Sequence, residues 1–284
     1  MTTKSDLAPV KRELVIDLAA KAGIDASDWG DFKGGKEKAS VNPKYCYEWA
    51  FVEPGKVVVI NLWHKALIED GDLIYQKINM RQRSAQPVNS SSEAVWKRRA
   101  EKFDKALQFA LSERLPIRAV LCDGKMRDPN DPHAKASSVT KRMLDPAPWA
   151  ITSYDQTTGE FIVTRGEEPS RFVDQFMVIK PDASPPEKRS QTVQAFARDS
   201  RVRKRALERA NGKCEWCNVE GFQMANGGIY LETHHIIPLA EGGLNKDTNV
   251  TALCPNHHRE AHYGKGRERM REELLKSIAA FVQK

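Results

Sequence analysis

Residue types that commonly bind metal ions gather in the last quarter of the chain. Three of its five cysteines and five of its seven histidines lie between positions 214 and 262. Cys214 and Cys217 form a C-x2-C pair, and Cys254 and His257 form a C-x2-H pair. Each pair can bring two ligands to one zinc ion, so the two pairs supply the four ligands of a tetrahedral Cys3His site. A site with four protein ligands has no open position for substrate, and its role is therefore expected to be structural.

The segment after Cys254 is expected to be a helix that carries histidines on two of its sides. His258 and His262 lie one turn apart on the same face, a spacing that suits a single metal ion. His257 is next to His258, so its side chain points about 100° away from that face. One helix is therefore expected to supply one ligand to the zinc site and two ligands to a second metal site.

Two further histidines, His234 and His235, follow a strand expected over residues 229–233. Neighbouring side chains of a strand face opposite sides of a sheet, so these two histidines need separate roles. Pro238 and the glycine pair at 242–243 predict a loop directly after them. The strand, the loop and the following helix are the elements that must bring the histidines together.

The order of these residues, LETHHIIPLAEGG, then NKDTNV, then ALCPNHHREAH, resembles that of the HNH endonucleases. It is most similar to the McrA-like, modification-dependent (type IV restriction) branch, in which zinc knuckles bracket the nuclease motif. The resemblance covers about residues 195–265. The second knuckle of the family usually reads C-P-x-C-H, and His257 stands here in place of its last cysteine. The fold that the resemblance implies for this part is a ββα-metal nuclease domain with zinc knuckles.

The resemblance also implies a role for each residue of the motif. The ligands of a divalent catalytic metal (Mg²⁺, Mn²⁺, Co²⁺ or Ni²⁺) would be His234, His258 and His262. The ligands of a structural Zn²⁺ would be Cys214, Cys217, Cys254 and His257. His235 would be the general base that activates water, since a neutral imidazole can accept a proton at physiological pH. Asn249 would brace the loop that orients His235.

The chain is expected to be an α+β protein with a mixed α/β N-terminal domain before the nuclease domain. The proline-rich stretch PDASPPEKRSQ indicates a linker. We therefore predict an N-terminal DNA-recognition domain over residues 1–180, a linker over 181–194 and an HNH endonuclease domain over 195–284.

Several elements of the N-terminal domain can be predicted from apolar periodicity. Helical spacing predicts a helix from Val10 to Ala22, closed by Gly23, and a long helix capped by Ser91 or Ser92. The stretch EWAFVEPGKVVVINLW predicts two strands joined by a turn at Pro54-Gly55. A buried strand is predicted over IRAVLC (117–122), and a hairpin over WAITSYDQTTGEFIVTRG.

The function of the N-terminal domain is much less evident from its residues. Six aromatic residues could either line a pocket for a base or form the core of a curved sheet: Trp29, Tyr45, Tyr47, Trp49, Trp63 and Trp149. Cys46 and Cys122 are expected to be buried thiols, and no role is assigned to His64 or His133. The resemblance to McrA-like enzymes implies a reader of modified bases here.

Charge and hydropathy limit the classes of partner. The formal net charge of +7 is consistent with a polyanionic partner, and basic residues crowd the segments 198–209 and 265–271. These two segments would either contact phosphates or form solvated helix faces. The N-terminal residues lack the apolar core of a signal peptide, and the chain has no apolar run of membrane-spanning length. A cytoplasmic protein without a membrane partner is expected.

The combined features predict a metal-dependent DNA endonuclease, a modification-dependent restriction enzyme with an N-terminal reader, acting on double-stranded modified DNA. One HNH site nicks one strand, so a homodimer is a candidate state for cutting both. The alternatives are a sequence-specific or phosphorothioate-dependent HNH nuclease and a non-catalytic, zinc-stabilised DNA-binding protein. The joint presence of the nuclease residues favours the enzyme: His234, His235, Asn249, His258 and His262.

Overall fold

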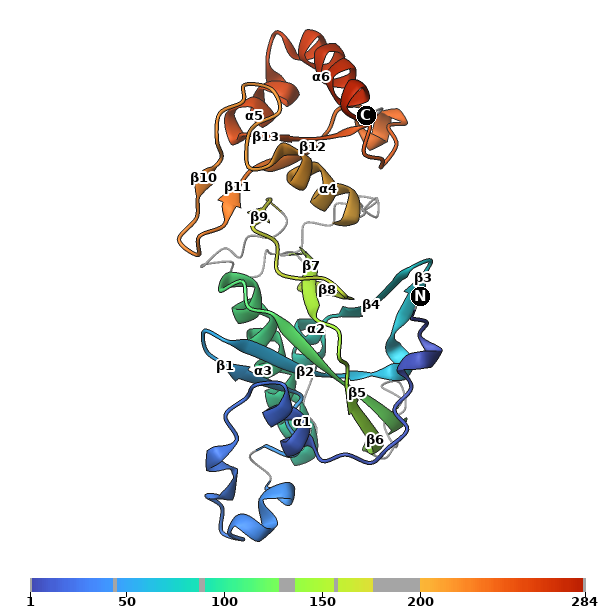
Figure 1. Cartoon of the computed structure of the whole chain (residues 1–284), viewed down its shortest axis with the longest axis vertical. Coiled ribbons are helices and arrows are strands. Elements are labelled where there is room, and N and C mark those ends of the chain that lie inside the picture. The colour runs from blue at the N-terminus through green and yellow to red at the C-terminus, as the bar shows by residue number, and fades with distance from the viewer. Residues whose placement is uncertain are drawn as a thin grey trace. The chain divides into compact units, whose positions relative to one another are not determined.

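The computed structural model describes residues 2–42, 45–86, 90–127, 136–155, 158–175 and 200–282. The chain forms two compact units, Met1–Pro169 and Ser170–Lys284, each of which is drawn in Figure 1. The units divide between residues 169 and 170, whereas the sequence predicts the end of the first domain at residue 180. The predicted linker at 181–194 and His133 lie outside the described residues.

The first unit is built on an eight-stranded sheet with the order β1-β2-β5-β7-β8-β4-β3, in which β6 pairs with β5. The strands are β1 (Ala50–Glu53), β2 (Val57–Trp63), β3 (Ile68–Asp70), β4 (Leu73–Ile78), β5 (Ile117–Lys125), β6 (Ser138–Leu144), β7 (Trp149–Asp155) and β8 (Glu160–Arg165). β2 and β5 are parallel and the other pairs are antiparallel. Both predicted hairpins, β1–β2 and β7–β8, and the buried strand β5 are confirmed.

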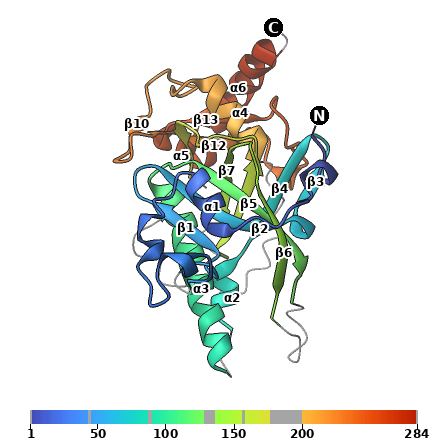
Figure 2. The same ribbon diagram turned by 60° about the horizontal axis from the view of Figure 1, so that its bottom comes forward.

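Helices cover this sheet on both faces. The α-helices are α1 (Val15–Lys21), α2 (Met80–Ser84) and α3 (Ser91–Ser112), and short 3-10 helices lie at Ser5–Leu7, Ser27–Gly30, Lys36–Val41 and His64–Ala66. α1 packs in a cluster with Val57 and Val59 of β2. Val58 and Ile60, which alternate with them, are also fully buried, and α3 contacts β1, β2 and β7. α1 and α3 therefore lie on opposite faces of the sheet (Figures 1 and 2).

Two predicted helix starts are corrected. The first helix begins at Val15 rather than near Val10, whose side chain is 76% exposed, because its apolar face starts only where the chain reaches the sheet. The cap of α3 is Ser90, one residue before the predicted positions, and its hydroxyl accepts a hydrogen bond from the Glu93 amide. Gly23 follows α1 with a φ of 104°, a conformation that glycine adopts without strain.

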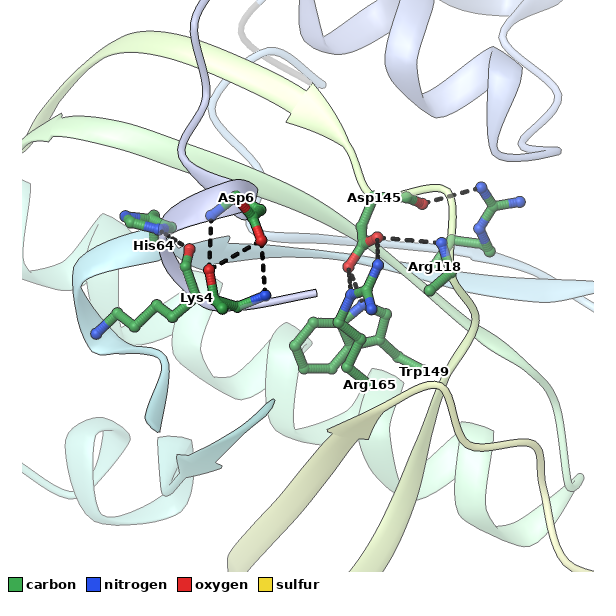
Figure 3. A network of polar contacts seen from close by, with 9 residues as sticks. Lys4, Asp6, His64, Arg118, Asp145, Trp149 and Arg165 are labelled. Atoms are coloured by element: carbon green, nitrogen blue, oxygen red, sulfur yellow. Dashed lines mark hydrogen bonds and ion pairs between the residues drawn. The ribbon is translucent and has the colours of Figure 1, made fainter. Parts of the chain in front are cut away.

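A buried polar network joins three strands of the first unit (Figure 3). The completely buried carboxylate of Asp145 accepts hydrogen bonds from Trp149 Nε1 at 3.0 Å and from Arg165 Nε at 2.8 Å. Arg118 of β5 donates to the Asp145 carbonyl oxygen at 3.2 Å. At a second place in Figure 3, a ring nitrogen of His64 lies 2.8 Å from the Lys4 carbonyl oxygen. His64, to which the sequence assigned no role, thus ties down the N-terminal segment.

The two tryptophans with the lowest exposure belong to the core. Trp29 and Trp149 are 1% and 0% exposed, and Trp29 stacks on Tyr45 with 4.5 Å between ring centroids. For Trp29 and Trp149, the structure therefore favours the alternative that they belong to the core and do not line a pocket for a base. Tyr47 and Trp49 are more accessible, since Tyr47 is exposed and Trp49 is half-buried.

The second unit is an α+β arrangement of short strands and three helices. Its elements are β9 (Phe172–Val173), α4 (Ser200–Ala210), β10 (Phe222–Gln223), β11 (Ile229–Tyr230), β12 (Glu232–His235), a 3-10 helix (Leu239–Glu241), β13 (Val250–Leu253), α5 (Pro255–Tyr263) and α6 (Arg267–Val282). β12 and β13 form a hairpin, and β10, β11 and β9 form a separate three-stranded sheet. The single strand expected over 229–233 is thus two strands, which belong to different sheets.

The core of the second unit lies between α4, the hairpin and α6. Leu207 of α4, Leu231, Leu253 of β13 and Leu274 of α6 are members of one buried cluster, which also includes Cys214. Because this cluster lies beside both the cysteines and the hairpin, it holds in place the elements that carry the metal-ligand residues. None of the helices in the described ranges has the length and apolar composition needed to span a membrane.

Candidate metal sites and nuclease centre

The hairpin β12–β13 places the first two histidines. His234 lies opposite Thr251 and His235 lies opposite Val250 in the antiparallel register. Strand β12 is held from outside by Gln175, whose side-chain amide nitrogen donates to the Thr233 carbonyl oxygen and whose amide oxygen accepts from the Thr233 amide. Asp174 also accepts a hydrogen bond from the Thr233 hydroxyl at 3.0 Å. The segment before the predicted linker thus supports the strand that carries the histidines.

Three histidines converge where β12 meets α5. The ring centroid of His234 lies 5.2 Å from that of His258 and 4.7 Å from that of His262. The Nε2 atoms of His258 and His262 are 3.2 Å apart. One nitrogen from each ring lies within 4.8 Å of the others, an arrangement that could hold a metal ion. The structure therefore brings together the three residues to which the sequence assigned a catalytic metal.

The surroundings of His234 keep its imidazole neutral. The side chain is 7% exposed, and burial, together with the neighbouring His258 and His262, lowers the pKa of His234 to about 3. Burial likewise lowers the pKa of His262. Metal ions bind the unprotonated imidazole, so a lowered pKa leaves these histidines available as ligands at neutral pH.

Glu232 is a residue of this centre that the sequence analysis missed. Its carboxylate forms a hydrogen bond with Nδ1 of His258, and it also accepts a hydrogen bond from the Tyr230 hydroxyl at 3.0 Å. With Nδ1 engaged, His258 presents Nε2 to His262 and to the space between the rings. The spacing carried a signal, since Glu232 and His234 are two residues apart on one strand and therefore share a face.

His235 is the last residue of β12, directly before the loop that joins β12 to β13. One of its ring nitrogens, Nε2, is 2.9 Å from the side-chain oxygen of Asn245, a second residue that the sequence analysis missed. Asn249 is 5% exposed and makes three hydrogen bonds across this loop, one with the amide and one with the carbonyl of Ile237, and one with the carbonyl of Leu244. The loop passes so close to Ile237 at Gly243 that any larger residue there would clash with the backbone.

The two pairs at the other side of α5 also meet. Four residues offer ligand atoms that lie within 4.8 Å of one another: Cys214, Cys217, Cys254 and His257. Nδ1 of His257 lies 3.0 Å from the sulfur of Cys254 and 3.9 Å from that of Cys214. The donor set, three thiols and one imidazole, is of the kind that binds zinc in structural sites. His257 thus offers a nitrogen donor where the family pattern has a sulfur.

Glu215, between the first two cysteines, ties this cluster to the hairpin. Its carboxylate binds Arg209 of α4 through Nε at 2.6 Å and Nη2 at 2.9 Å. The same carboxylate accepts hydrogen bonds from the Thr251 hydroxyl and the Ala252 amide of β13. The knuckle, α4 and β13 are therefore held as one body, and His234 lies opposite Thr251 within it.

Most of the basic residues around these clusters are held by carboxylates. In α4, Arg203 pairs with the buried Asp174, Arg205 with Asp247 and Arg209 with Glu215. In α6, Arg269 pairs with Glu273, and Arg271 spans Glu241 and Glu268. Ion pairing thus accounts for much of the charge that the sequence suggested for phosphate contact or for a solvated face.

A cleft of about 260 Å³ opens beside two of the three histidines, His234 and His262. His234 and His262 form one part of its wall, and Glu241, Arg267 and Arg271 form another. The histidine cluster is therefore accessible from a polar cleft that contains both positive and negative side chains. A substrate with a charged phosphate could approach the cluster from this side.

Comparison with known proteins agrees with this geometry. The family model described as HNH endonuclease matches residues 214–264. Over 84 residues the chain is 42% identical to the "Type IV methyl-directed restriction enzyme EcoKMcrA" of Escherichia coli (strain K12). The match covers 29% of this chain and spans only 30% of the length of that relative.

Two solved structures share a broader but weaker likeness. One is the "Type IV phosphorothioation-dependent restriction endonuclease ScoMcrA", with a TM-score of 0.32, 14% identity and coverage of 80% of this chain and 50% of that chain. The other is the "Modification dependent TagI restriction endonuclease", with a TM-score of 0.26, 15% identity and coverage of 80% and 74%. These TM-scores are too low to define a shared fold. The sequence match, by contrast, includes both clusters: residues 214–264 of this chain match the HNH endonuclease family.

Proposed function

We propose that the protein is a metal-dependent endonuclease that hydrolyses phosphodiester bonds of double-stranded DNA. The observation that carries the proposal is the convergence of His234, His258 and His262, two of which, His234 and His262, line a polar cleft. A divalent cation, Mg²⁺, Mn²⁺, Co²⁺ or Ni²⁺, would supply charge neutralisation at the scissile phosphate and at the leaving 3′ oxygen. The three imidazoles fit such an ion because one nitrogen of each faces the same small volume.

His235 is the proposed general base. It follows His234 directly in β12 but forms its own hydrogen bond, with the Asn245 side-chain oxygen. This contact favours the tautomer with a proton on Nε2, and Nδ1 is then unprotonated and able to accept a proton from water. Asn249 would hold the loop of Asn245 in place through its three hydrogen bonds.

Glu232 is proposed to position His258. A carboxylate that accepts a hydrogen bond from one nitrogen of a metal-binding histidine sets the tautomer and the direction of the other nitrogen. Tyr230 donates to the same carboxylate, so Glu232 is itself oriented. On the other side of α5, the cluster of Cys214, Cys217, Cys254 and His257 would hold a structural Zn²⁺.

The biological substrate class proposed is modified DNA, with the first unit as the reader. The support is the relative that matches the nuclease domain, which is described as a methyl-directed restriction enzyme. A cytoplasmic location follows from a DNA substrate in a restriction role. A homodimer is proposed for double-strand cleavage, because each chain carries a single cluster of this kind among its described residues.

The test of the catalytic proposal is cleavage of duplex DNA by the full chain with each of the four divalent metals. The wild-type protein is expected to cut, and His235→Ala is expected to lose cleavage while it keeps its zinc content and DNA binding. Cleavage by His235→Ala at the wild-type rate would rule out the assigned base. Wild-type protein that binds DNA but never cuts it, with any metal, would favour the non-catalytic DNA-binding alternative.

The substrate class is tested with a panel of duplexes of one sequence. The duplexes are unmodified, cytosine-methylated, hydroxymethylated or phosphorothioated. Preferential cleavage of a base-modified duplex is expected if the first unit reads modified bases. Equal cleavage of all four would contradict a modification-dependent enzyme, and cleavage of the phosphorothioated duplex alone would favour the backbone-reading alternative.

A further inference from the structure

Three arginines of the first unit differ from the paired arginines of the second unit in what surrounds their guanidinium groups. In the second unit, the guanidinium groups of Arg203, Arg205 and Arg209 each bind a carboxylate. In the first unit, three arginines lie instead over aromatic rings, with guanidinium-to-centroid distances of 4.9 Å for Arg83 over Trp49, 4.3 Å for Arg127 over Trp96 and 5.6 Å for Arg99 over Tyr47. Within the described ranges, none of these three guanidinium groups forms an ion pair.

Two of these pairs form what we term the arginine–tryptophan cluster, namely Trp49, Arg83, Trp96 and Arg127. Trp49 lies just before β1, Arg83 in α2, Trp96 in α3 and Arg127 just after β5. α2 and α3 pack along one another (Figure 2), so Arg83 of α2 lies beside the helix that carries Trp96. Partial burial of the guanidinium group and the charge of Arg127 lower the pKa of Arg83, so the two cations interact electrostatically.

Two neighbouring cations without a carboxylate repel each other, and this arrangement is costly unless an anion joins them. Arg83 is exposed and Arg127 is half-buried, so both can be reached from solvent. Nε of Arg127 is buried without a hydrogen-bond partner among the described residues, as is Nε of Arg99. Among the described residues, the cluster therefore offers positive charge that no carboxylate neutralises.

We propose that the arginine–tryptophan cluster binds phosphate groups of the backbone of duplex DNA. The proposal rests on the proposed function, because DNA is chosen as the polyanion that the nuclease domain would cut. A guanidinium group that is stacked on an indole ring loses little conformational freedom on binding, and its planar edge matches the oxygens of a phosphate. The cluster thus positions the first unit on DNA without reading base sequence.

Salt dependence of binding tests this proposal directly. Binding of the full chain to a fluorescently labelled 25-base-pair duplex is measured by anisotropy at several salt concentrations, without added divalent metal so that no cleavage occurs. Each phosphate contact contributes about 0.9 to the slope of log K against log salt concentration. The double variant Arg83→Gln/Arg127→Gln is expected to lower this slope by about 1.8 and to weaken binding at least about tenfold.

A matched control removes the same charge elsewhere in the first unit. Lys11 and Lys65 are exposed and lie outside the elements that carry the cluster, and Lys11→Gln/Lys65→Gln is expected to bind DNA with nearly the wild-type slope. An equal slope in the cluster variant and the wild type, or equal losses in the cluster and control variants, would overturn the proposal. Tighter binding to duplex RNA than to DNA of the same sequence would overturn the choice of DNA.

A conservative variant separates binding from packing. Arg83→Lys/Arg127→Lys keeps both charges but removes the planar donors, so it is expected to retain the salt slope and to lose part of the affinity. If this variant binds as weakly as the glutamine variant and also unfolds at a lower temperature, the arginines serve packing instead. Cleavage assays test the nuclease function separately from this binding proposal. A protein that binds DNA through the cluster but never cuts it would contradict only the proposed nuclease function.

Discussion

The two metal-ligand clusters of the second unit share helix α5 but differ in how far the protein encloses them. The cysteine cluster offers four ligand atoms, and Cys214 is 1% exposed within the main core. The histidine cluster offers three ligand atoms and ranges from the buried His234 to the exposed His262, and these two residues line a cleft. His257 and His258 are adjacent residues that belong to different clusters.

Because of this difference, we expect the cysteine cluster to contribute to stability and the histidine cluster to contribute to catalysis, although both take a ligand residue from a single turn of helix. Four protein ligands complete the coordination of zinc and leave no position for substrate, whereas three ligands leave positions for water and a phosphate oxygen. The first cluster is bound to the hairpin through Glu215, so loss of its metal would disturb the frame of the second cluster. The reverse does not hold, because the histidine cluster lies at the surface of that frame.

The largest expected effect comes from opening the enclosed cluster. Cys214→Ser should remove the zinc and destabilise the second unit by about 5 kcal/mol or more, because the binding energy of a structural zinc contributes to folding. Zinc content and resistance of the second unit to proteolysis measure this effect. Cys46→Ser, a change of a half-buried cysteine in the first unit, is the control and should keep its zinc. Retention of full zinc content by Cys214→Ser would contradict the four-ligand assignment.

The adjacent residues His257 and His258 belong to different clusters, so single substitutions of them test the two clusters separately. His258→Ala should lower cleavage by more than about 100-fold while zinc content and thermal unfolding stay near wild type, because it removes a ligand of the open cluster only. His257→Ala should lower zinc content and the unfolding temperature, and cleavage should fall with the folded fraction. If both variants lose zinc to the same extent, the two clusters are not separate sites.

Sequence patterns were sufficient to predict which residues gather in the two clusters, because local spacing carries much of this information. The C-x2-C and C-x2-H pairs and the i, i+4 pair of His258 and His262 depend on one turn or one helix. The hairpins β1–β2 and β7–β8 were likewise predicted from alternation and a nearby turn signal. In each case the residues that determine the geometry are close together in the sequence.

Contacts between distant residues could not be predicted in the same way. The basic residues of α4 looked available for phosphates because their partners, Asp174, Glu215 and Asp247, lie in other elements. Asn245 was missed because its position depends on how Asn249 closes the loop. The exposed Val10 shows the same limit, since helical spacing alone does not say where the chain first meets the sheet.

A smaller effect is expected from the residue that orients one ligand of the open cluster. Glu232→Gln should weaken the affinity for the catalytic metal about 10- to 100-fold, because the neutral amide holds the His258 imidazole less well. Cleavage as a function of Mn²⁺ concentration measures this affinity, and saturating metal should restore much of the rate. Tyr230→Phe, which removes only the hydrogen bond to Glu232, should have a weaker effect of the same kind. An unchanged metal dependence in Glu232→Gln would show that the carboxylate has no positioning role.

The smallest expected effect comes from Asn245, which contacts the proposed base and none of the metal-ligand residues. Asn245→Ala should lower the cleavage rate on the order of tenfold at saturating metal, because the His235 ring loses the contact that selects its tautomer and direction. Metal affinity and zinc content should not change, which distinguishes this variant from Glu232→Gln. Asn245→Asp places a negative charge beside the ring and favours its protonated form. Since the base must be unprotonated, the acid limb of the pH–rate profile should move to higher pH in Asn245→Asp, and an unmoved limb would mean that His235 does not act as the base.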